Sequence, residues 1–352
     1  MEVKRRTLSG VYRPHATIRN HNWRNPLALP MPTSTHFHLT NYRQFTHLQN
    51  ILITGFRVHN GIHSRSSTIR RAMPSKPKLG QNFLRDQRAI ERIVTAVGDC
   101  AARTVIEIGP GRGAITGPLA ARAGRVVAVE LDTELAGRLR EELPSERVTV
   151  VNQDVLDFDF TAASAEARER LLVVGNLPYL ITSPILLKLA ANQASLDRAV
   201  LMVQREVADR VTARPGSRDY GLLSVTVQLH GPVEALFTLA PGAFSPPPDV
   251  HSTVFRWRFA PRFAELNVQP TEFIRFLRQA FAQKRKTLAN NLRAVKFPAE
   301  SVAGALAVAG VEPMARAESL SIEALASIWR DLRTKEATPL GGVAPLHSLS
   351  EH

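Results

Sequence analysis

The feature of the sequence that most restricts its fold is a regular alternation of strand-like and helix-like segments between residues 87 and 204. Short apolar runs rich in Val, Ile and Leu alternate with stretches whose apolar residues recur at helical spacing. Strands are expected at Thr104–Ile108, Arg125–Glu130, Val148–Gln153, Leu171–Gly175 and Ala199–Gln204, and helices at Gln87–Val97, Ala114–Ala123, Leu135–Leu143 and Pro184–Ala191. This order predicts an α/β fold with a parallel, doubly wound sheet covered by helices on both faces.

Two further regions complete the expected architecture. Val250–Phe259 alternates in hydrophobicity after Pro246-Pro247-Pro248, which favours an added strand that closes the sheet and allows an antiparallel direction. After Pro270 the pattern is wholly helical, at Thr271–Val295, Ala299–Val308 and Ile322–Leu332. We therefore expect an α/β domain at residues 73–262, a small helical domain at 268–333 and a flexible tail at 334–352.

Residues 1–72 differ from the rest of the chain in charge and in pattern. They carry eleven Lys and Arg residues and one acid, and so supply +10 of the formal net charge of +14. They show no sustained periodicity, which predicts a disordered extension. Three interpretations stay open: an upstream extension with Met73 as the true initiator, an organelle transit peptide, or a basic arm that contacts RNA.

The composition excludes several classes of protein. The single cysteine, Cys100, excludes a disulfide framework and a cysteine-rich zinc site, and no ligand pair stands at metal-binding spacing, so no metal is expected. The longest apolar stretch, Val302–Val311, is 10 residues, too short to cross a bilayer, so no membrane partner is expected. The positive net charge favours an anionic partner such as nucleic acid.

The first candidate ligand site is the segment Glu107-Ile-Gly109-Pro-Gly111-Arg-Gly113, between a predicted strand and helix. Its glycines let the backbone approach a ligand, and the helix N-terminus offers free N–H groups. Glu130 ends the next strand, where a carboxylate can accept both hydroxyls of a ribose, and Asp154 follows the third, where it could accept an adenine amino group. A purely structural turn is the alternative. The G-x-G-x-G spacing argues against an NAD enzyme, and no P-loop motif is present.

The fourth predicted strand ends in Asn176-Leu177-Pro178-Tyr179. The Asn176 side-chain carbonyl and a backbone carbonyl near Leu177 or Pro178 can accept the two N–H bonds of an aromatic amine. These bonds would point the nitrogen lone pair at an electrophile. Tyr179 offers a face on which an extruded base can stack. The alternative is a turn without function.

These motifs resemble the small-subunit ribosomal RNA adenine N6,N6-dimethyltransferases, the KsgA family, over about residues 76–332. The resemblance rests on Gln81–Leu84 with Asp86, Glu107–Gly113, Glu130–Asp132, Gln153-Asp154, Asn176–Tyr179, Phe244–Pro248, Ala280–Leu288 and Arg316–Ser321. It implies a class I (Rossmann-like) methyltransferase sheet with a small C-terminal helical domain, and S-adenosylmethionine as the methyl donor.

The resemblance also implies roles for individual residues. The residues expected to contact the donor are Asn82, Leu84, Gly109, Glu130, Asp154 and Asn176. The expected amine-orienting motif is Asn176, Leu177, Pro178 and Tyr179, with Phe244 as a second aromatic surface for the target adenine. For Asn82–Leu84, a hydrophobic staple at the start of the first helix is an equal interpretation.

Two residues depart from the family pattern. Leu180 stands where Asn is usual, directly after the amine-orienting motif. Lys284 stands where Arg is usual, in an expected basic helix with Arg285, Lys286 and Arg293. A solvated face is the ordinary interpretation of such a charge run, and contact with RNA phosphates is the functional one.

The implied activity is dimethylation of two adjacent adenines near the 3′ end of small-subunit rRNA, within an immature ribosomal subunit. The protein is expected to be a cytoplasmic monomer, with organelle import through residues 1–72 as the alternative. One rival function is a large-subunit rRNA methyltransferase of the antibiotic-resistance type, against which the three-proline segment and the long C-terminal domain argue. The other is a non-catalytic nucleic-acid-binding factor on the same scaffold, against which Glu130, Asp154 and Asn176–Tyr179 argue.

Overall fold

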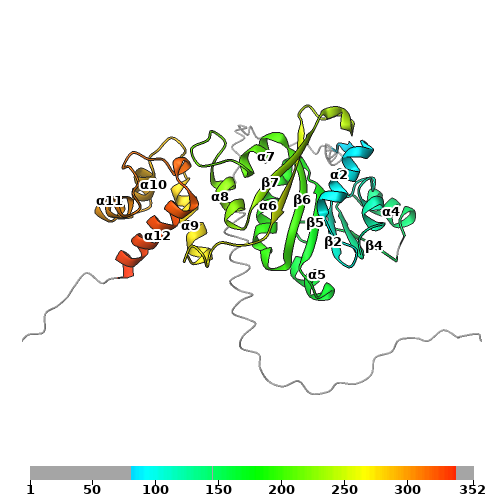
Figure 1. Cartoon of the computed structure of the whole chain (residues 1–352), viewed down its shortest axis with the longest axis horizontal. Coiled ribbons are helices and arrows are strands. Elements are labelled where there is room, and N and C mark those ends of the chain that lie inside the picture. The colour runs from blue at the N-terminus through cyan, green and yellow to red at the C-terminus, as the bar shows by residue number, and fades with distance from the viewer. Residues whose placement is uncertain (1–80, 145, 338–352) are drawn as a thin grey trace, which may run out of the picture. The chain divides into compact units, whose positions relative to one another are not determined.

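A computed structural model describes residues 81–337 except Ser145, so the expectation for residues 1–72 lies outside the described residues. Its centre is a seven-stranded sheet in the order β4-β3-β2-β5-β6-β9-β7 (Figure 1). The strands are β2 (Thr104–Ile108), β3 (Arg125–Glu130), β4 (Val148–Asn152), β5 (Leu171–Asn176), β6 (Leu196–Gln204), β7 (Val233–Leu239) and β9 (Ser252–Arg258). The first five run parallel, as the alternating pattern predicts, and β9 is antiparallel to both β6 and β7.

The expectation that Val250–Phe259 closes the sheet is wrong. The corresponding strand β9 lies between β6 and β7, and β7 is the edge strand. The sequence pattern missed β7 because its register shifts between Ala235 and Phe237, and only Leu239 of its seven residues is buried. An edge strand with a bulge carries neither a continuous apolar run nor a clean alternation.

Helices cover both faces of the sheet (Figure 1). Alternate residues of each strand enter separate cores: Val105 and Val174 pack with α2 (Gln87–Val97) and α3 (Thr116–Ala120). Their neighbours Ile106 and Val173 enter the core on the other face. The helices of that face are α5 (Phe160–Ala167), α6 (Thr182–Ala191), α7 (Arg205–Val211) and α8 (Leu222–Leu229). The remaining helix of this region is α4 (Thr133–Glu142).

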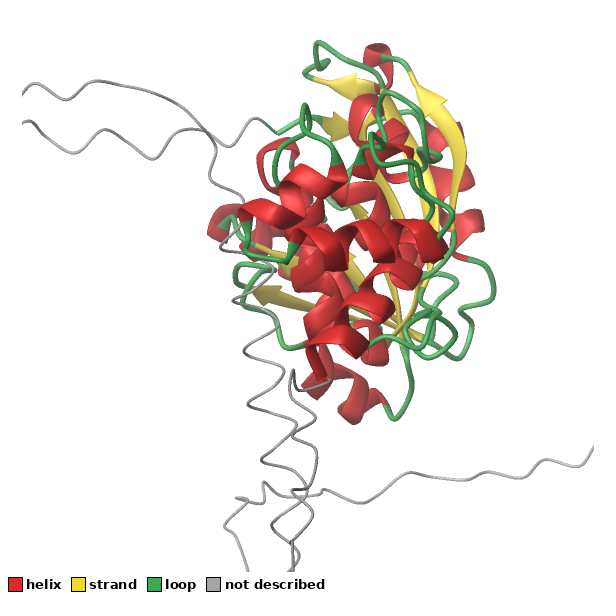
Figure 2. Ribbon diagram, turned by 90° about the vertical axis from the view of Figure 1, so that its left-hand side faces the viewer, coloured by secondary structure: helices red, strands yellow, loops and turns green. Residues whose placement is uncertain are grey.

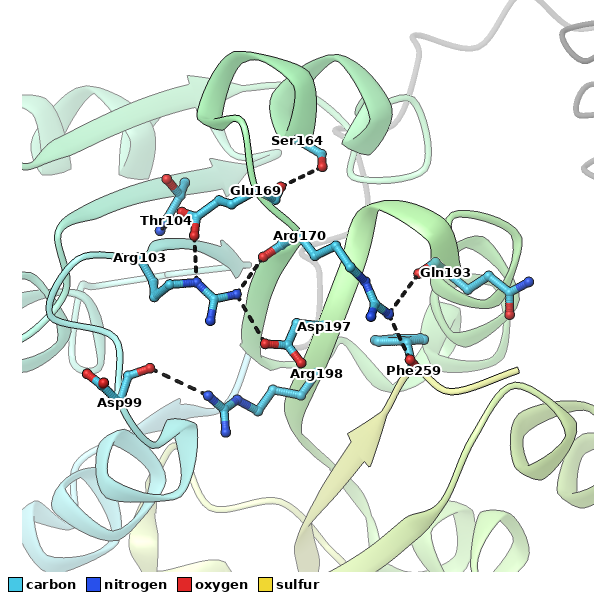
Figure 3. Close-up of polar contacts among 10 residues, drawn as sticks. All are labelled: Asp99, Arg103, Thr104, Ser164, Glu169, Arg170, Gln193, Asp197, Arg198 and Phe259. Carbon is cyan, nitrogen blue, oxygen red and sulfur yellow. Dashed lines mark hydrogen bonds and ion pairs between the residues drawn. The ribbon is translucent and has the colours of Figure 1, made fainter. Parts of the chain in front are cut away.

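Ion pairs tie together the amino ends of three neighbouring strands (Figure 3). The Arg103 guanidinium, just before β2, contacts Glu169 at 2.5 Å and Asp197 at 3.1 Å, from the starts of β5 and β6. Glu169 also accepts the Thr104 backbone N–H at 2.6 Å. The charged side chains at this end of the sheet are thus paired with one another. Parallel sheets of this kind bind ligands at the opposite end, beyond the carboxyl ends of the strands.

The C-terminal region is a group of short helices (Figure 2). They are α9 (Pro270–Ala280), α10 (Leu288–Ala294), α11 (Ala299–Val308) and α12 (Ile322–Ala337). They share a core with Leu187 of α6 and with Val225 and Leu229 of α8. No helix in residues 81–337 is long and apolar enough to cross a membrane.

Three expectations for this region need correction. Thr271–Val295 is not one helix: α9 ends at Ala280 and α10 begins after its N-cap Thr287, whose side chain accepts from the Asn290 N–H. The buried Asn291 stabilises the break by donating to the carbonyls of Ala280, at 2.8 Å, and Gln283, at 3.3 Å. Lys284, Arg285 and Lys286 therefore lie in an exposed turn, and not on a helix. The expected start of the tail at residue 334 is wrong, since α12 continues to Ala337.

Candidate active site

A pocket of about 660 Å³ lies at the carboxyl ends of β2, β3 and β5. With one exception, every residue that the sequence predicted for the site lines this pocket: Asn82, Leu84, Gly109, Glu130, Asp154, Asn176, Leu177, Pro178 and Tyr179. The structure thus brings together segments separated by up to about a hundred residues, which supports one binding site and leaves each residue's role a prediction.

The glycine loop and Glu130 form one rigid unit. Gly111, at a φ of 59° that favours glycine, donates its N–H to Glu130 Oε2 at 3.0 Å. Glu130 Oε1 accepts the Asp132 N–H at 2.9 Å, and the side chain is almost wholly buried. Each oxygen keeps further lone-pair capacity, so the carboxylate can still accept the two hydroxyls of a ribose.

Asn82 is placed by strand pairing and not by a hydrophobic staple. Phe83 and Leu84 form the short strand β1, which pairs antiparallel with β8 (Phe244–Ser245). A staple would need an apolar residue directly before the N-cap Asp86, and that position holds the exposed Arg85. The pairing holds the residue 81–84 segment against one side of the pocket.

The Asn176 side chain has a defined orientation. Its Nδ2 donates to the Asn82 backbone carbonyl at 3.1 Å, which leaves Oδ1 as the free acceptor. The Pro178 carbonyl already accepts from the Thr182 hydroxyl at 2.9 Å and the Ile181 N–H at 3.2 Å. Of the two backbone acceptors considered, the Leu177 carbonyl is therefore the better placed. Oxygen acceptors on two successive residues that both line the pocket suit an amine with two N–H bonds.

Tyr179 lines the pocket, and a hydrogen bond at its hydroxyl fixes the position of its ring. Its hydroxyl lies 3.1 Å from the Ser252 hydroxyl, at the start of β9. The side chain is half-buried, so part of the ring stays available for stacking.

Phe244 is the exception among the predicted site residues. It does not line the pocket, and only 1% of it is exposed. It packs in the same core as Leu84 and Ile90, because its strand β8 faces inward against α2. In this arrangement its ring offers no face to a base, and Pro247, Pro248 and Val250 of the same loop line the pocket in its place.

Glu107 is a site residue that the sequence analysis quoted in the glycine motif without assigning it a role. It is 1% exposed, lines the pocket, and its Oε2 has no hydrogen-bond partner among the described residues. Burial, aided by the charge of Glu130, raises the pKa of Glu107 to about 7. The detectable pattern was an acid inside the apolar strand Thr104–Ile108.

This pKa predicts a pH-dependent stability. Between the ordinary value of 4.5 and about 7, the folded protein keeps a proton on Glu107 that the unfolded chain has lost. Stability should therefore fall as pH rises through this window, by about 3 kcal/mol in total. Gln cannot ionise, so the free energy of unfolding of Glu107→Gln should not fall in this window. Measured by urea unfolding, the stability of the variant relative to wild type should therefore be higher at pH 8 than at pH 5. The exposed Glu141→Gln serves as the control, and a wild-type–Glu107→Gln difference that is independent of pH would contradict the assignment.

No group of three or more His, Cys, Asp or Glu side chains in residues 81–337 is arranged to hold a metal ion.

The fold and the pocket define a class I methyltransferase: a seven-stranded sheet with an inserted antiparallel strand, and a glycine loop with acids at its carboxyl edge. The chain belongs to the ribosomal RNA adenine dimethylase family, whose model matches residues 73–333.

Named relatives and solved structures agree with this membership. The chain is 61% identical to the ribosomal RNA small subunit methyltransferase A of Acidobacterium capsulatum, over 74% of this chain and 92% of that protein. It is 46% identical to the protein of the same name from Koribacter versatilis, over 73% and 94%. A dimethyladenosine transferase from Plasmodium falciparum has the same fold, with a TM-score of 0.62 and 23% identity over 72% of this chain and 98% of that one. The 23S rRNA methyltransferase ErmE also has a similar structure, with a TM-score of 0.57 and 28% identity over 72% of this chain and 100% of that one.

Proposed function

We propose that this protein transfers methyl groups from S-adenosylmethionine to the N6 amines of two adjacent adenines near the 3′ end of small-subunit rRNA. The observation that carries this proposal is the fixed orientation of Asn176. Its Nδ2 is held by the Asn82 carbonyl, so its Oδ1 and the Leu177 carbonyl form a pair of acceptors in the pocket that also holds Glu130. That pair suits an exocyclic amine on an aromatic base.

The polar groups of the pocket fit the proposed donor. Glu130 would bind the ribose hydroxyls, and Asp154 the adenine amino group of the donor. The buried, unpartnered Glu107 Oε2 offers an acceptor for the donor's ammonium group. When bound, S-adenosylmethionine supplies an electrophilic methyl group on its sulfonium.

The chain's own residues prepare the amine for transfer. An exocyclic adenine amine is a poor nucleophile because its lone pair is delocalised into the ring. Hydrogen bonds from its two N–H groups to Asn176 Oδ1 and the Leu177 carbonyl favour a pyramidal nitrogen whose lone pair points into the pocket. Tyr179, held by Ser252, stacks on the extruded base. No strong base is needed before transfer, because the alkylated nitrogen loses its proton readily.

The choice of substrate rests on the relatives. Proteins 61% and 46% identical to this chain are named for the small ribosomal subunit, whereas the 23S rRNA methyltransferase is 28% identical. The exposed basic turn of Lys284, Arg285 and Lys286 would contact RNA phosphates. In this proposal the protein acts as a cytoplasmic monomer on immature small subunits.

The test is transfer of labelled methyl groups to four substrates: immature small subunits lacking the modification, mature small subunits, large subunits and naked rRNA. The expected result is transfer to immature small subunits above the other three. Preference for the large subunit would support the resistance-type activity instead. Donor binding without transfer to any substrate would indicate a non-catalytic factor.

Removal of residues 1–72 is expected to leave catalysis unchanged, since the family match begins at residue 73. A chain starting at Met73 should melt at the same temperature as the full chain and methylate subunits at an equal rate. At low salt its RNA affinity should fall somewhat, because ten net positive charges are removed, and the difference should shrink as salt rises. Insolubility or a clearly lower melting temperature would show that the boundary at Met73 is wrong.

A further inference from the structure

Leu180 is an apolar side chain that the proposed chemistry does not use. It is 88% exposed, the highest value among the large exposed hydrophobic residues of the described chain. It also lines the pocket, directly after Tyr179. An isolated exposed leucine is ordinary on a protein surface, so its placement and its neighbours decide whether it has a role.

The backbone holds Leu180 in a fixed outward position. It is the middle residue of a 3₁₀ turn, Tyr179–Ile181, in which three successive side chains point in three directions. Tyr179 reaches Ser252, and Ile181 packs on the core of one sheet face. The turn is fastened where Pro178 O accepts from the Ile181 N–H and the Thr182 hydroxyl. Leu180 is left exposed at the edge of the pocket that it lines.

Leu180 does not stand alone at the mouth of the pocket. Leu131, 47% exposed, and Val250, 42% exposed, line the same pocket from the ends of other loops. The remaining large exposed hydrophobic residues of the described chain, Val295, Val308 and Met314, all lie in the C-terminal helical region. Three of the six large exposed hydrophobic residues of the described chain therefore line the pocket that a base would have to enter.

A base that enters this pocket must first leave its stack. Extrusion opens a gap between the neighbouring bases, and apolar side chains that fill such gaps offset part of the lost stacking. We propose that Leu180 is a positioning residue that inserts into the gap left by the target adenine and keeps this adenine extruded towards Tyr179. This inference rests on the proposed function, because it needs a nucleobase as the substrate.

The test compares Leu180→Ala with wild type on immature small subunits whose rRNA carries 2-aminopurine in place of the base next to the target adenine. Fluorescence of 2-aminopurine rises when its neighbour unstacks. We expect kcat/KM for methyl transfer to fall about tenfold, the scale for losing burial of roughly two methylene-sized groups, and the fluorescence rise on binding to shrink. The melting temperature should not change, since Leu180 is exposed and loses little packing.

A second substrate separates insertion from a general loss of contact. In this RNA the base next to the target is abasic, so extrusion breaks less stacking, and the deficit of Leu180→Ala should shrink to about twofold or less. Leu180→Met should behave like wild type. Val308→Ala, which removes a 67% exposed side chain on α11, serves as the matched control and should change neither readout.

The outcomes are distinguishable. Unchanged kcat/KM and fluorescence for Leu180→Ala, or an equal loss on both substrates, would overturn the insertion role while the proposed function stands. Absence of transfer by wild type to any adenine-containing RNA would overturn the proposed function and this inference with it.

Discussion

Replacing Asn176 with alanine is expected to slow methyl transfer about 10²–10³-fold, or about 2.7–4 kcal/mol of transition-state stabilisation, the scale for removing one preorganised hydrogen-bonding group. The variant loses the Oδ1 acceptor that orients the target amine. It also loses the Nδ2 bond to the Asn82 carbonyl that fixes this orientation. Because both losses act on the reacting amine, kcat should fall while RNA affinity changes much less. Single-turnover transfer to immature subunits measures the chemical step directly.

The control for this prediction is Asn176→Asp, which keeps an acceptor oxygen but cannot donate to Asn82. Its rate should lie between those of wild type and Asn176→Ala. If Asn176→Ala turns over within a few-fold of wild type, the amine-orienting role of Asn176 is wrong.

Replacing Glu130 with alanine is expected to weaken donor binding by about 3–6 kcal/mol. This corresponds to two hydrogen bonds to a charged group at about 1.5–3 kcal/mol each. The loss has a second cause, since the carboxylate also accepts the N–H groups of Gly111 and Asp132 and so fixes the glycine loop. Calorimetric titration with S-adenosylmethionine gives the affinity, and RNA binding should be little affected.

Two variants sharpen this result. Glu134→Ala removes an exposed carboxylate from the first turn of α4, four residues away, and should bind the donor like wild type. Asp154→Ala should weaken donor binding less than Glu130→Ala does, because it removes a single proposed contact with the donor. Unchanged donor affinity in both the Glu130 and Asp154 variants would place the nucleoside elsewhere.

The central parallel strands β2, β3 and β5 were predictable from sequence because they are buried on both faces. β5 reads as an apolar run, β2 as one interrupted by Glu107, and Thr104–Ile108 and Arg125–Glu130 begin and end where the pattern placed them. The helix α8 was missed for a related reason. Val225 and Leu229 enter one core while Leu223 and Val227 enter another, so this helix has no polar face to reveal its period.

The break between α9 and α10 was missed because it depends on a tertiary contact. Residues 283–287 are all polar, which is compatible with the basic face of one long helix as well as with a turn. The turn is held by the buried Asn291, which donates to two carbonyls, those of Ala280 at the end of α9 and Gln283. The sequence alone does not indicate which backbone carbonyls the side chain of a buried asparagine will bind.

The candidate site was predictable as a set of strand ends, since residues that follow parallel strands meet at one edge of the sheet. Its finer geometry was not. The orientation of Asn176 depends on a carbonyl 94 residues away, at Asn82. The burial of Phe244 depends on pairing between β1 and β8, two strands of two residues each that have no periodicity to detect.

The central claim is that the pocket dimethylates adenine N6 on small-subunit rRNA, and the chemical identity of the product tests it most directly. Immature small subunits lacking the modification would be incubated with the protein and S-adenosylmethionine, and the rRNA digested and analysed by mass spectrometry. The expected product is N6,N6-dimethyladenosine at two adjacent positions near the 3′ end, and none is expected with Asn176→Ala over the same time. Methylation at another atom, on another base, or in large-subunit rRNA alone would contradict it.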